Sequence, residues 1–274
     1  MALYERVDGI PILVAADGKA VEHGPTQRQR EYFDREDDAA FEVTRPHGTP
    51  RLHQWLLGEK FRRSVTAVRA MLDGALVVSV CGGSGMDAEF LAAEGARVLL
   101  ADISPGAAKR ARERAERFDL PIFPLVADAL QLPLADRSVD VAYIHDGLHH
   151  LDRPLVGVAE MCRVARRAIS ITEPARAAVT AAAVKAGLAL EEEEAGNRVE
   201  RLTLAEIAQE LQRHGFEVLC AERYAMYYRH RPGPASRWLS APAAFDLSKT
   251  GFRALNLLAG RFGNKLAVQA VRGD

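Results

Sequence analysis

Residues 75–104 read ALVVSV-CGGSG-MDAEFLAAEGA-RVLLADIS, and this stretch decides the fold of the chain. Its first six residues form an apolar run that is too short for a helix and is typical of a buried strand. A glycine-rich loop follows, then a helical segment that Gly95 ends, then a second strand over 98–101 with Asp102 at its carboxyl end. The stretch therefore predicts a βαβ unit with a glycine turn, the half-fold that holds a nucleoside in an open parallel sheet.

The residue types in this loop suit a nucleoside ligand. Glycines allow a sharp turn and let a ligand approach the main chain closely. The helix that follows offers unpaired N–H groups and a partial positive end. Asp102 lies seventeen residues beyond Gly85, and we expect both of its carboxylate oxygens to be free to accept the two hydroxyls of a ribose.

Two kinds of cofactor fit the glycine loop. Residues 83–88, GSGMDA, match the dinucleotide fingerprint G-x-G-x-x-[G/A]. The same stretch resembles motif I of the class I S-adenosylmethionine (SAM) methyltransferases, in which a hydrophobic strand ends in G-x-G-x-G. In this chain Cys81 stands in place of the first glycine and Ser79 in place of the usual acidic residue. The loop alone leaves both cofactors open.

A second motif favours SAM. A third strand is expected over 122–127, and it ends at Asp128-Ala129, followed by Leu132-Pro133. This junction resembles the D-A-x-x-L-P segment of the SAM methyltransferases, and the resemblance implies that Asp128 and Ala129 face the adenine ring. The cofactor-binding residues implied in this way are Cys81, Gly82, Gly83, Gly85, Asp102, Ile103, Asp128, Ala129 and His145.

Histidines follow the fourth expected strand, over 139–144. The segment H-D-G-L-H-H-L, residues 145–151, resembles the fourth motif of the small-molecule and quinone-modifying (ubiquinone–menaquinone type) branch of the family. His145 and His149 are candidate catalytic bases, because a histidine near neutral pKa can remove a proton from an attacking hydroxyl or amine. A metal site at these histidines and Asp146 is the weaker interpretation, so we predict no metal.

The composition of the chain limits the classes of substrate and binding partner. The chain has 274 residues, a net charge of −1 and 48% apolar residues, with no basic stripe of interleaved aromatics. It also lacks the N/D-P-P-Y motif of many exocyclic-amine methyltransferases. We therefore expect a small-molecule substrate, aromatic or amphipathic, and no nucleic acid. Three dispersed cysteines and the lack of a leader-like start or a long apolar run predict a cytoplasmic protein without a membrane span. A homodimer is a further expectation.

The predicted organisation has three parts: an N-terminal arm over 1–23, a helical lid over 24–74, and a SAM-binding domain over 75–274 with a cap-like insertion at about 224–262. The arm contains a short strand after a turn at Asp8-Gly9. It is similar to the closing segment of a small zinc-ribbon unit, without that unit's cysteines. The candidates for a lid over the cofactor and substrate are Tyr32, Phe33, His47 and Trp55.

The remaining pattern completes an α/β fold: a Rossmann-like, seven-stranded, mostly parallel sheet with helices on both faces. Resemblance to the family implies that the last strand is antiparallel and forms a hairpin with the sixth. The further helices are expected at 51–72, 105–117, 154–164, 175–186 and 203–215, and the further strands at 168–172, 216–221 and 264–271.

The predicted function is transfer of the SAM methyl group to an oxygen, nitrogen or carbon atom of a small molecule. One alternative is an NAD(P)-dependent oxidoreductase that uses the same loop, although the chain lacks the Y-x-x-x-K pair of the short-chain type. Another alternative is a non-catalytic SAM-binding protein with a degenerate motif I.

Overall fold

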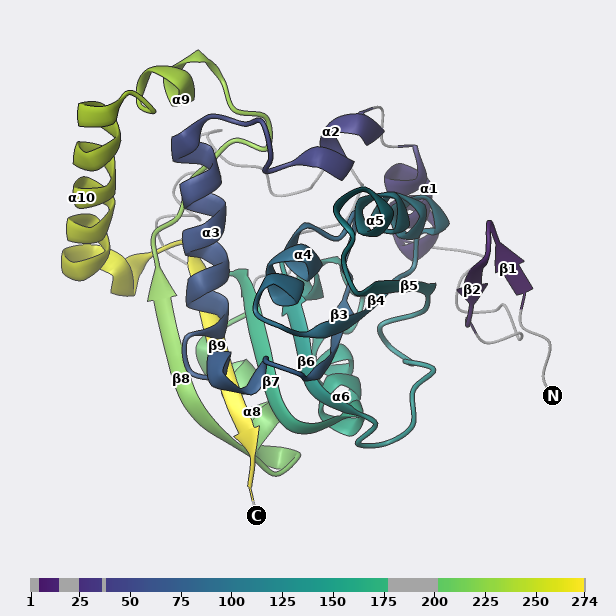
Figure 1. Cartoon of the computed structure of the whole chain (residues 1–274). Coiled ribbons are helices and arrows are strands. Elements are labelled where there is room, and N and C mark those ends of the chain that lie inside the picture. Colours follow the sequence, from purple (N-terminus) through teal and green to yellow (C-terminus); the bar gives the residue numbers. More distant parts are fainter. Residues whose placement is uncertain (1–4, 15–24, 36–37, 177–201, 274) are drawn as a thin grey trace.

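The computed structural model describes residues 5–14, 25–35, 38–176 and 202–273. Within them, one mixed sheet of nine strands has the order β1-β2-β5-β4-β3-β6-β7-β9-β8. Helices cover both of its faces (Figure 1). The α/β Rossmann-like class predicted from the sequence is confirmed.

The first βαβ unit forms where the sequence predicts it. β3 (Leu76–Val80) enters the glycine loop, α4 (Met86–Ala93) crosses the sheet, and β4 (Arg97–Asp102) returns parallel to β3. Ser104 then caps α5 (Pro105–Phe118), accepting a hydrogen bond from the Ala107 N–H at 2.9 Å. The proline at the first helical position suits this start, because its missing N–H would have no partner there.

The following elements extend the sheet on both sides of β3. β5 (Ile122–Val126) pairs with β4, and β6 (Val139–His145) pairs with β3 on its other side. β9 runs antiparallel between β7 and β8, which agrees with the antiparallel last strand that the family resemblance implied. The remaining elements here are η2 (Leu148–His150), α6 (Pro154–Val164), β7 (Ala165–Pro174), α8 (Leu204–Arg213), β8 (Phe216–Tyr224) and β9 (Lys265–Arg272).

The expected number of seven strands is wrong, because the N-terminal arm adds two more. β1 (Glu5–Val7) and β2 (Ile10–Ile12) form a hairpin around the predicted turn, where Asp8 and Gly9 both have positive φ. β2 pairs in parallel with β5, which would otherwise be the edge strand, and the Leu13 N–H donates to the Val126 carbonyl at 2.8 Å. An edge strand presents unpaired backbone groups, and the hairpin satisfies some of them.

The expected helix over 51–72 is shorter than predicted. α3 (Arg51–Val65) ends seven residues early, and only a short 3₁₀ turn, η1 (Arg69–Met71), follows. The side-chain carbonyl of Gln269 on β9 accepts from the Ala67 N–H at 2.5 Å, so this N–H is bonded outside the helix. A contact from a strand two hundred residues away is not visible in local periodicity. The expected helix at 175–186 and the acidic run at 191–194 fall largely outside the described residues.

Alternating side chains of the central strands pack into two apolar cores, one on each face of the sheet. On one face Val77 and its neighbours pack against α3, α4 and α5, including the fully buried Leu91. On the other face Val78 packs with residues of α6 and α8, among them Met161 and Leu211. A parallel sheet buried on both faces leaves its strand ends as the place for ligands.

Short helices border the strand ends. α1 (Pro25–Asp34) and α2 (Ala39–Thr44) lie against α5, and Asp34 accepts from the Ser104 hydroxyl at 2.6 Å and the Gly106 N–H at 2.8 Å. At the opposite side α10 stands outside α3, and α9 leads into it (Figure 1). The bounds of this last region are α9 (Pro234–Trp238), α10 (Pro242–Ala259) and η3 (Gly260–Phe262).

Candidate functional site

Two adjoining cavities open at the carboxyl ends of β3, β4, β5 and β6. The first, here called the inner pocket, holds about 170 Å³ and is mostly apolar. The second, here called the polar chamber, holds about 380 Å³ and is lined by many charged side chains. Both cavities share Phe33, Cys81, Gly83, Asp146 and His150, so they form one continuous site.

The glycine loop forms the floor between the two cavities. Gly83 has φ +54° and open space where a Cβ would lie, whereas a Cβ on Gly82 would sit 2.5 Å from the Leu100 side chain. Gly85, with φ +82°, is the N-cap of α4 and does not line either cavity. The loop thus needs glycine for three different reasons: open access, close packing and a left-handed turn.

Cys81 occupies a left-handed conformation with φ +51°, at the position where motif I has its first glycine. Such a backbone costs a non-glycine residue of the order of 1 kcal/mol or more. Burial, and then the nearby Asp102 carboxylate, raise the pKa of its thiol well above the ordinary value. Cys81 therefore meets a ligand as a neutral side chain.

Asp102 is braced by the loop that it faces. One carboxylate oxygen accepts from the Gly83 N–H at 2.8 Å, and the other accepts from the Ser104 N–H at 2.9 Å. The expectation that both oxygens would be free of protein partners is therefore wrong. Each carboxylate oxygen has two acceptor positions, so one remains on each oxygen for a ligand hydroxyl. Burial raises the pKa of this carboxyl despite those two bonds.

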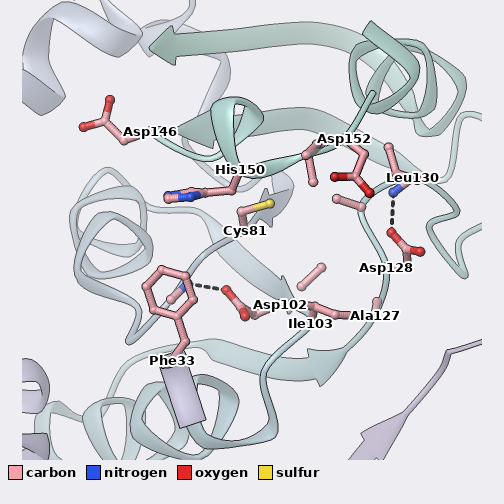
Figure 2. Close-up of a pocket in the computed structure, with 14 residues that line it drawn as sticks. Phe33, Cys81, Asp102, Ile103, Ala127, Asp128, Leu130, Asp146, His150 and Asp152 are labelled. Atoms are coloured by element: carbon pink, nitrogen blue, oxygen red, sulfur yellow. Dashed lines mark hydrogen bonds between the residues drawn. The ribbon is translucent and has the colours of Figure 1, made fainter. Parts of the chain in front are cut away.

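The next strand supplies the far wall of the inner pocket. Ile103, Asp128 and Ala129 line it, and one Asp128 oxygen accepts from the Leu130 N–H at 2.8 Å. Figure 2 shows Asp102 and Asp128 at neighbouring strand ends, with Phe33, Cys81 and His150 around the same space. Apolar walls between two carboxylates are suited to a flat ring that carries a polyol.

His145 lies at the end of β6, buried at the base of the polar chamber. Its Nδ1 is 3.2 Å from the Tyr143 hydroxyl, while its Nε2 is buried with no hydrogen-bond partner in the described part of the chain. Burial, and then the charge of Lys60, lower the pKa of His145 to about 4. The imidazole is therefore neutral near pH 7 and a weak proton acceptor.

His149 belongs to a buried pair with a carboxylate. Its Nδ1 is 2.7 Å from Oε2 of Glu173, and both side chains are almost fully buried. Oε1 of Glu173 accepts from the Gly147 and Leu148 N–H groups at 2.8 and 2.7 Å. The carboxylate therefore favours the tautomer in which Nδ1 carries the proton and Nε2 holds the lone pair.

Opposite charges are paired around the polar chamber. Lys265 Nζ lies 2.6 and 2.7 Å from the two oxygens of Asp146, and this cation lowers the pKa of Asp146 in spite of its burial. Lys60 Nζ is 3.7 Å from Asp87. Burial lowers the pKa of Lys60, but Asp87, Tyr228 and Asp146 together outweigh burial, so the pKa of Lys60 is raised. The chamber thus holds one buried and one partly buried ammonium group together with carboxylates, an arrangement that suits a zwitterionic or anionic ligand group.

The four lid candidates are in different places. Phe33 lines both cavities, and its backbone carbonyl accepts a hydrogen bond from the Arg110 guanidinium at 2.6 Å. His47 pairs with Glu89 and Phe118, and Trp55 packs against the rings of Phe245 and Phe252 of α10. Neither residue lines the inner pocket or the polar chamber. Tyr32 is 39% exposed and packs edge-on to Phe33.

Several chamber residues have no signal in the local sequence. Lys60 comes from the middle of α3, and Lys265 from the first position of β9. Glu173, which pairs with the chamber residue His149, is the next-to-last residue of β7 and resembles an ordinary strand terminus. Tyr228 belongs to the segment after β8 in which the sequence suggested an aromatic substrate cap, and it lines the chamber.

The described residues contain neither a cluster of metal ligands nor a membrane-spanning helix. No group of three or more His, Cys, Asp or Glu side chains there is arranged to hold a metal ion. Likewise, none of the helices that the structure describes combines the length and the apolar character needed to cross a bilayer.

Comparisons with known proteins agree with the geometry. Residues 78–168 match a family model described as a methyltransferase domain. The demethylmenaquinone methyltransferase of Renibacterium salmoninarum is 33% identical over 107 residues, which are 39% of this chain and 44% of that protein. That of Thermobifida fusca is 31% identical over 115 residues, covering 40% and 48%. The chain thus matches less than half the length of these curated relatives.

Solved structures share the fold over most of the chain. The magnesium protoporphyrin IX methyltransferase of Synechocystis PCC 6803 with bound SAH has a TM-score of 0.59 at 19% identity, covering 89% of this chain and 98% of that one. The [4+2]-cyclase SpnF has a TM-score of 0.53 at 18% identity, covering 85% and 93%. At these identities the likeness shows the fold alone.

Proposed function

We propose that this chain, whose residues 78–168 are a domain of the class I methyltransferase type, binds SAM and transfers its methyl group to a small molecule. The observation that carries the proposal is the continuity of the two cavities. An apolar pocket between Asp102 and Asp128 opens, past the glycine loop, into a charged chamber that contains His149. A nucleoside and a reactive acceptor group can therefore lie side by side.

The residues of the inner pocket fit an adenosyl group. Asp102 keeps one acceptor position on each oxygen for the ribose hydroxyls, and Ile103 and Ala129 provide apolar contact for the purine. Asp128 keeps one oxygen outside its bond to Leu130 for a purine amino group. The open space over Gly83 lets the ligand approach the backbone. Once bound, SAM supplies an electrophilic methyl group.

The polar chamber fits the amino-acid end of the same molecule. Lys60 and Lys265 are available to an α-carboxylate, and Asp146 and Asp87 to an α-ammonium group. Cys81 and Gly83, which line both cavities, lie between the two ends. Paired charges of this kind hold a zwitterion without leaving an uncompensated charge when it binds.

His149 is the proposed general base, in preference to His145. Glu173 orients its ring and favours a lone pair on Nε2, so His149 can accept a proton from an acceptor hydroxyl or amine in the chamber. His145, with its pKa lowered to about 4, instead positions ligand groups through its buried Nε2. Phe33 and Tyr228 help to exclude water above the site.

The proposed acceptor is an aromatic or amphipathic small molecule. Phe33, Met86 and Tyr228 give the chamber apolar walls beside its charged groups. The curated relatives are demethylmenaquinone methyltransferases, and a ring with an ionisable hydroxyl would suit both these walls and the proposed base His149. The methylated atom is open among oxygen, nitrogen and carbon.

Calorimetry with SAM, S-adenosylhomocysteine and NAD(H) tests the cofactor. The proposal expects binding of the first two and none of the third. Binding of NAD(H) alone would instead favour the NAD(P)-dependent oxidoreductase, an alternative that the match to a methyltransferase domain does not support. Transfer of label from methyl-labelled SAM to a panel of hydroquinones and phenols then distinguishes an enzyme from a SAM-binding protein.

A cytoplasmic location and a homodimer remain proposals. The three cysteines, Cys81, Cys162 and Cys220, form no disulfide, as expected for a reducing compartment. Fractionation of the producing cell tests the first proposal, and light scattering of the purified chain tests the second.

A further inference from the structure

Large apolar side chains are exposed on the outer face of α10 and beside it. Leu257 is 86% exposed, Leu258 80%, Leu247 73% and Trp238 72%. Phe262 and Leu255 are also more than half exposed. Isolated exposed leucines are ordinary, but a cluster of this size on one segment indicates an interaction surface.

Exposed apolar residues recur along α10 at helical spacing. Leu247, Ala254 and Leu258 follow one another at intervals of seven and four along α10, and all three are exposed. The opposite side of the helix holds Phe245 and Phe252, which pack against Trp55 of α3. α10 is therefore apolar on two faces, and only one of them is covered within the described residues.

The segment that carries this outer face is rich in cations. Residues 225–263 contain six Lys or Arg against a single Asp, although the whole chain has a net charge of −1. Arg229, Arg237, Arg253 and Arg261 are exposed, and none of them has a carboxylate within ion-pair distance in the residues that the structure describes. The rest of the chain carries the compensating acidic excess, so positive charge is concentrated in the segment that contains the exposed leucines.

A groove between α10 and α3 adds to this charge. Arg62, Arg63 and Arg253 line it with Leu257 and Glu59. Glu59 already accepts from Arg62 at 2.6 Å and from Arg63 at 3.2 Å, which leaves Arg253 as the cation of the groove without an ion-pair partner among described side chains. A guanidinium beside an exposed leucine can contact a phosphate while the leucine enters an apolar layer.

We propose that the outer face of α9 and α10 docks on the surface of a membrane that contains anionic lipids. Basic residues together with exposed Leu, Trp and Phe on one helix face are the features that hold a helix in the headgroup layer. Charge complementarity selects this occupant over a second copy of the chain. A twofold interface through α10 would bring the same arginines of both copies together, and they would repel.

The docking face is joined to the polar chamber by one stretch of chain. The connection from β8 to α9 carries Tyr227, which is 81% exposed, next to Tyr228, which lines the polar chamber. His230 in the same connection lines the chamber and lies 2.7 Å from Glu42 of α2. In Figure 1 this connection runs from the top of β8 past α2 and α3 to α9. An amphipathic acceptor held in a bilayer would thus meet the chamber from the docked side.

Vesicle flotation of the whole chain tests the proposal without any measurement of methyl transfer. Vesicles of phosphatidylcholine alone are compared with vesicles that contain about a third phosphatidylglycerol. We expect binding to the anionic vesicles, a loss of binding at high salt, and a blue shift of Trp238 fluorescence. Failure to bind either vesicle would overturn the docking surface while leaving the proposed methyl transfer intact.

Substitutions locate the contact. Leu247→Glu with Leu258→Glu should reduce the partition coefficient roughly tenfold or more, and Arg237→Gln with Arg253→Gln should reduce it on anionic vesicles only. The matched controls are Phe123→Glu and Arg97→Gln, which alter exposed residues of β5 and β4 far from α10 in the sheet order. Equal binding by all variants would refute the assignment. So would a dimer that the leucine substitutions convert to a monomer, since the face would then join two copies.

Discussion

Replacement of Asp102 tests the cofactor site most directly, because its carboxylate has two separate tasks in the structure. It accepts from the Gly83 and Ser104 N–H groups, and it keeps one acceptor position on each oxygen for a ribose hydroxyl. Asp102→Asn keeps the shape but offers one acceptor oxygen and an NH₂ group that cannot accept. Asp102→Ala removes both tasks.

Hydrogen bonds to a charged group contribute about 1.5–3 kcal/mol each, and water recovers part of this when they are lost. We therefore expect both variants to weaken SAM binding by about 1–3 kcal/mol, which is a rise in Kd of roughly five- to 150-fold. Isothermal calorimetry measures the change. Thermal unfolding run in parallel shows whether the loop has remained folded.

The control is Asp136→Asn, because Asp136 is 76% exposed on its side chain and lies outside both cavities. It should bind SAM as the wild type does. If Asp102→Asn and Asp102→Ala were folded and bound SAM within twofold of the wild type, the pocket would be misplaced and the proposed function would lose its main support.

Three further predictions use different observables. Glu173→Gln should lower kcat at least tenfold while leaving the Kd for SAM near that of the wild type, because an amide cannot favour the same His149 tautomer. Equal turnover would remove the His149–Glu173 pair from the mechanism. Because the pKa of His145 falls from 6.5 to about 4 on folding, the unfolded chain binds more protons between these values, and the free energy of unfolding should fall by up to about 3 kcal/mol as pH drops through that window. Urea titrations at several pH values should show a shallower dependence in His145→Gln, and an unchanged slope would exclude His145 as its source. Gly82→Ala should lower the free energy of unfolding by about 1–3 kcal/mol, because the new Cβ would overlap the buried Leu100 side chain. Gly58→Ala in α3, where the Cβ would meet open space, should raise the free energy of unfolding by up to about 1 kcal/mol. Similar effects of the two variants in chemical denaturation would contradict the packing argument.

Local elements were predictable where short-range chemistry is sufficient. Ser104 with Pro105 begins α5, and Thr203 with Glu206 forms the capping box of α8, as their sequence patterns indicate. The end of α3 was not predictable, because Gln269 accepts the Ala67 N–H from a distant strand. Nor did the sequence distinguish a packed arm from two added strands, since the β2–β5 pairing depends on backbone groups that any residue offers.

The candidate site divides in the same way. Much of the inner pocket is formed by residues at or just beyond the ends of strands, so Asp102 and Asp128 could be placed from their position after an apolar run. The hydrogen bond from the Gly83 N–H to Asp102 could not be predicted, because Gly83 comes close to Asp102 only in the folded loop. The partners Glu173 for His149 and Lys265 for Asp146 are also distant in sequence.

By itself, the sequence determined the βαβ unit, the fold class and the strand ends at which a nucleoside can bind. These follow from apolar periodicity and glycine positions, which act over a few neighbouring residues. The tertiary structure alone decided the electrostatics: which histidine is paired with a carboxylate, which is held neutral, and where the cations gather. A proton affinity or a charged surface is the sum of groups brought together by folding, and their distances are not present in the order of the residues.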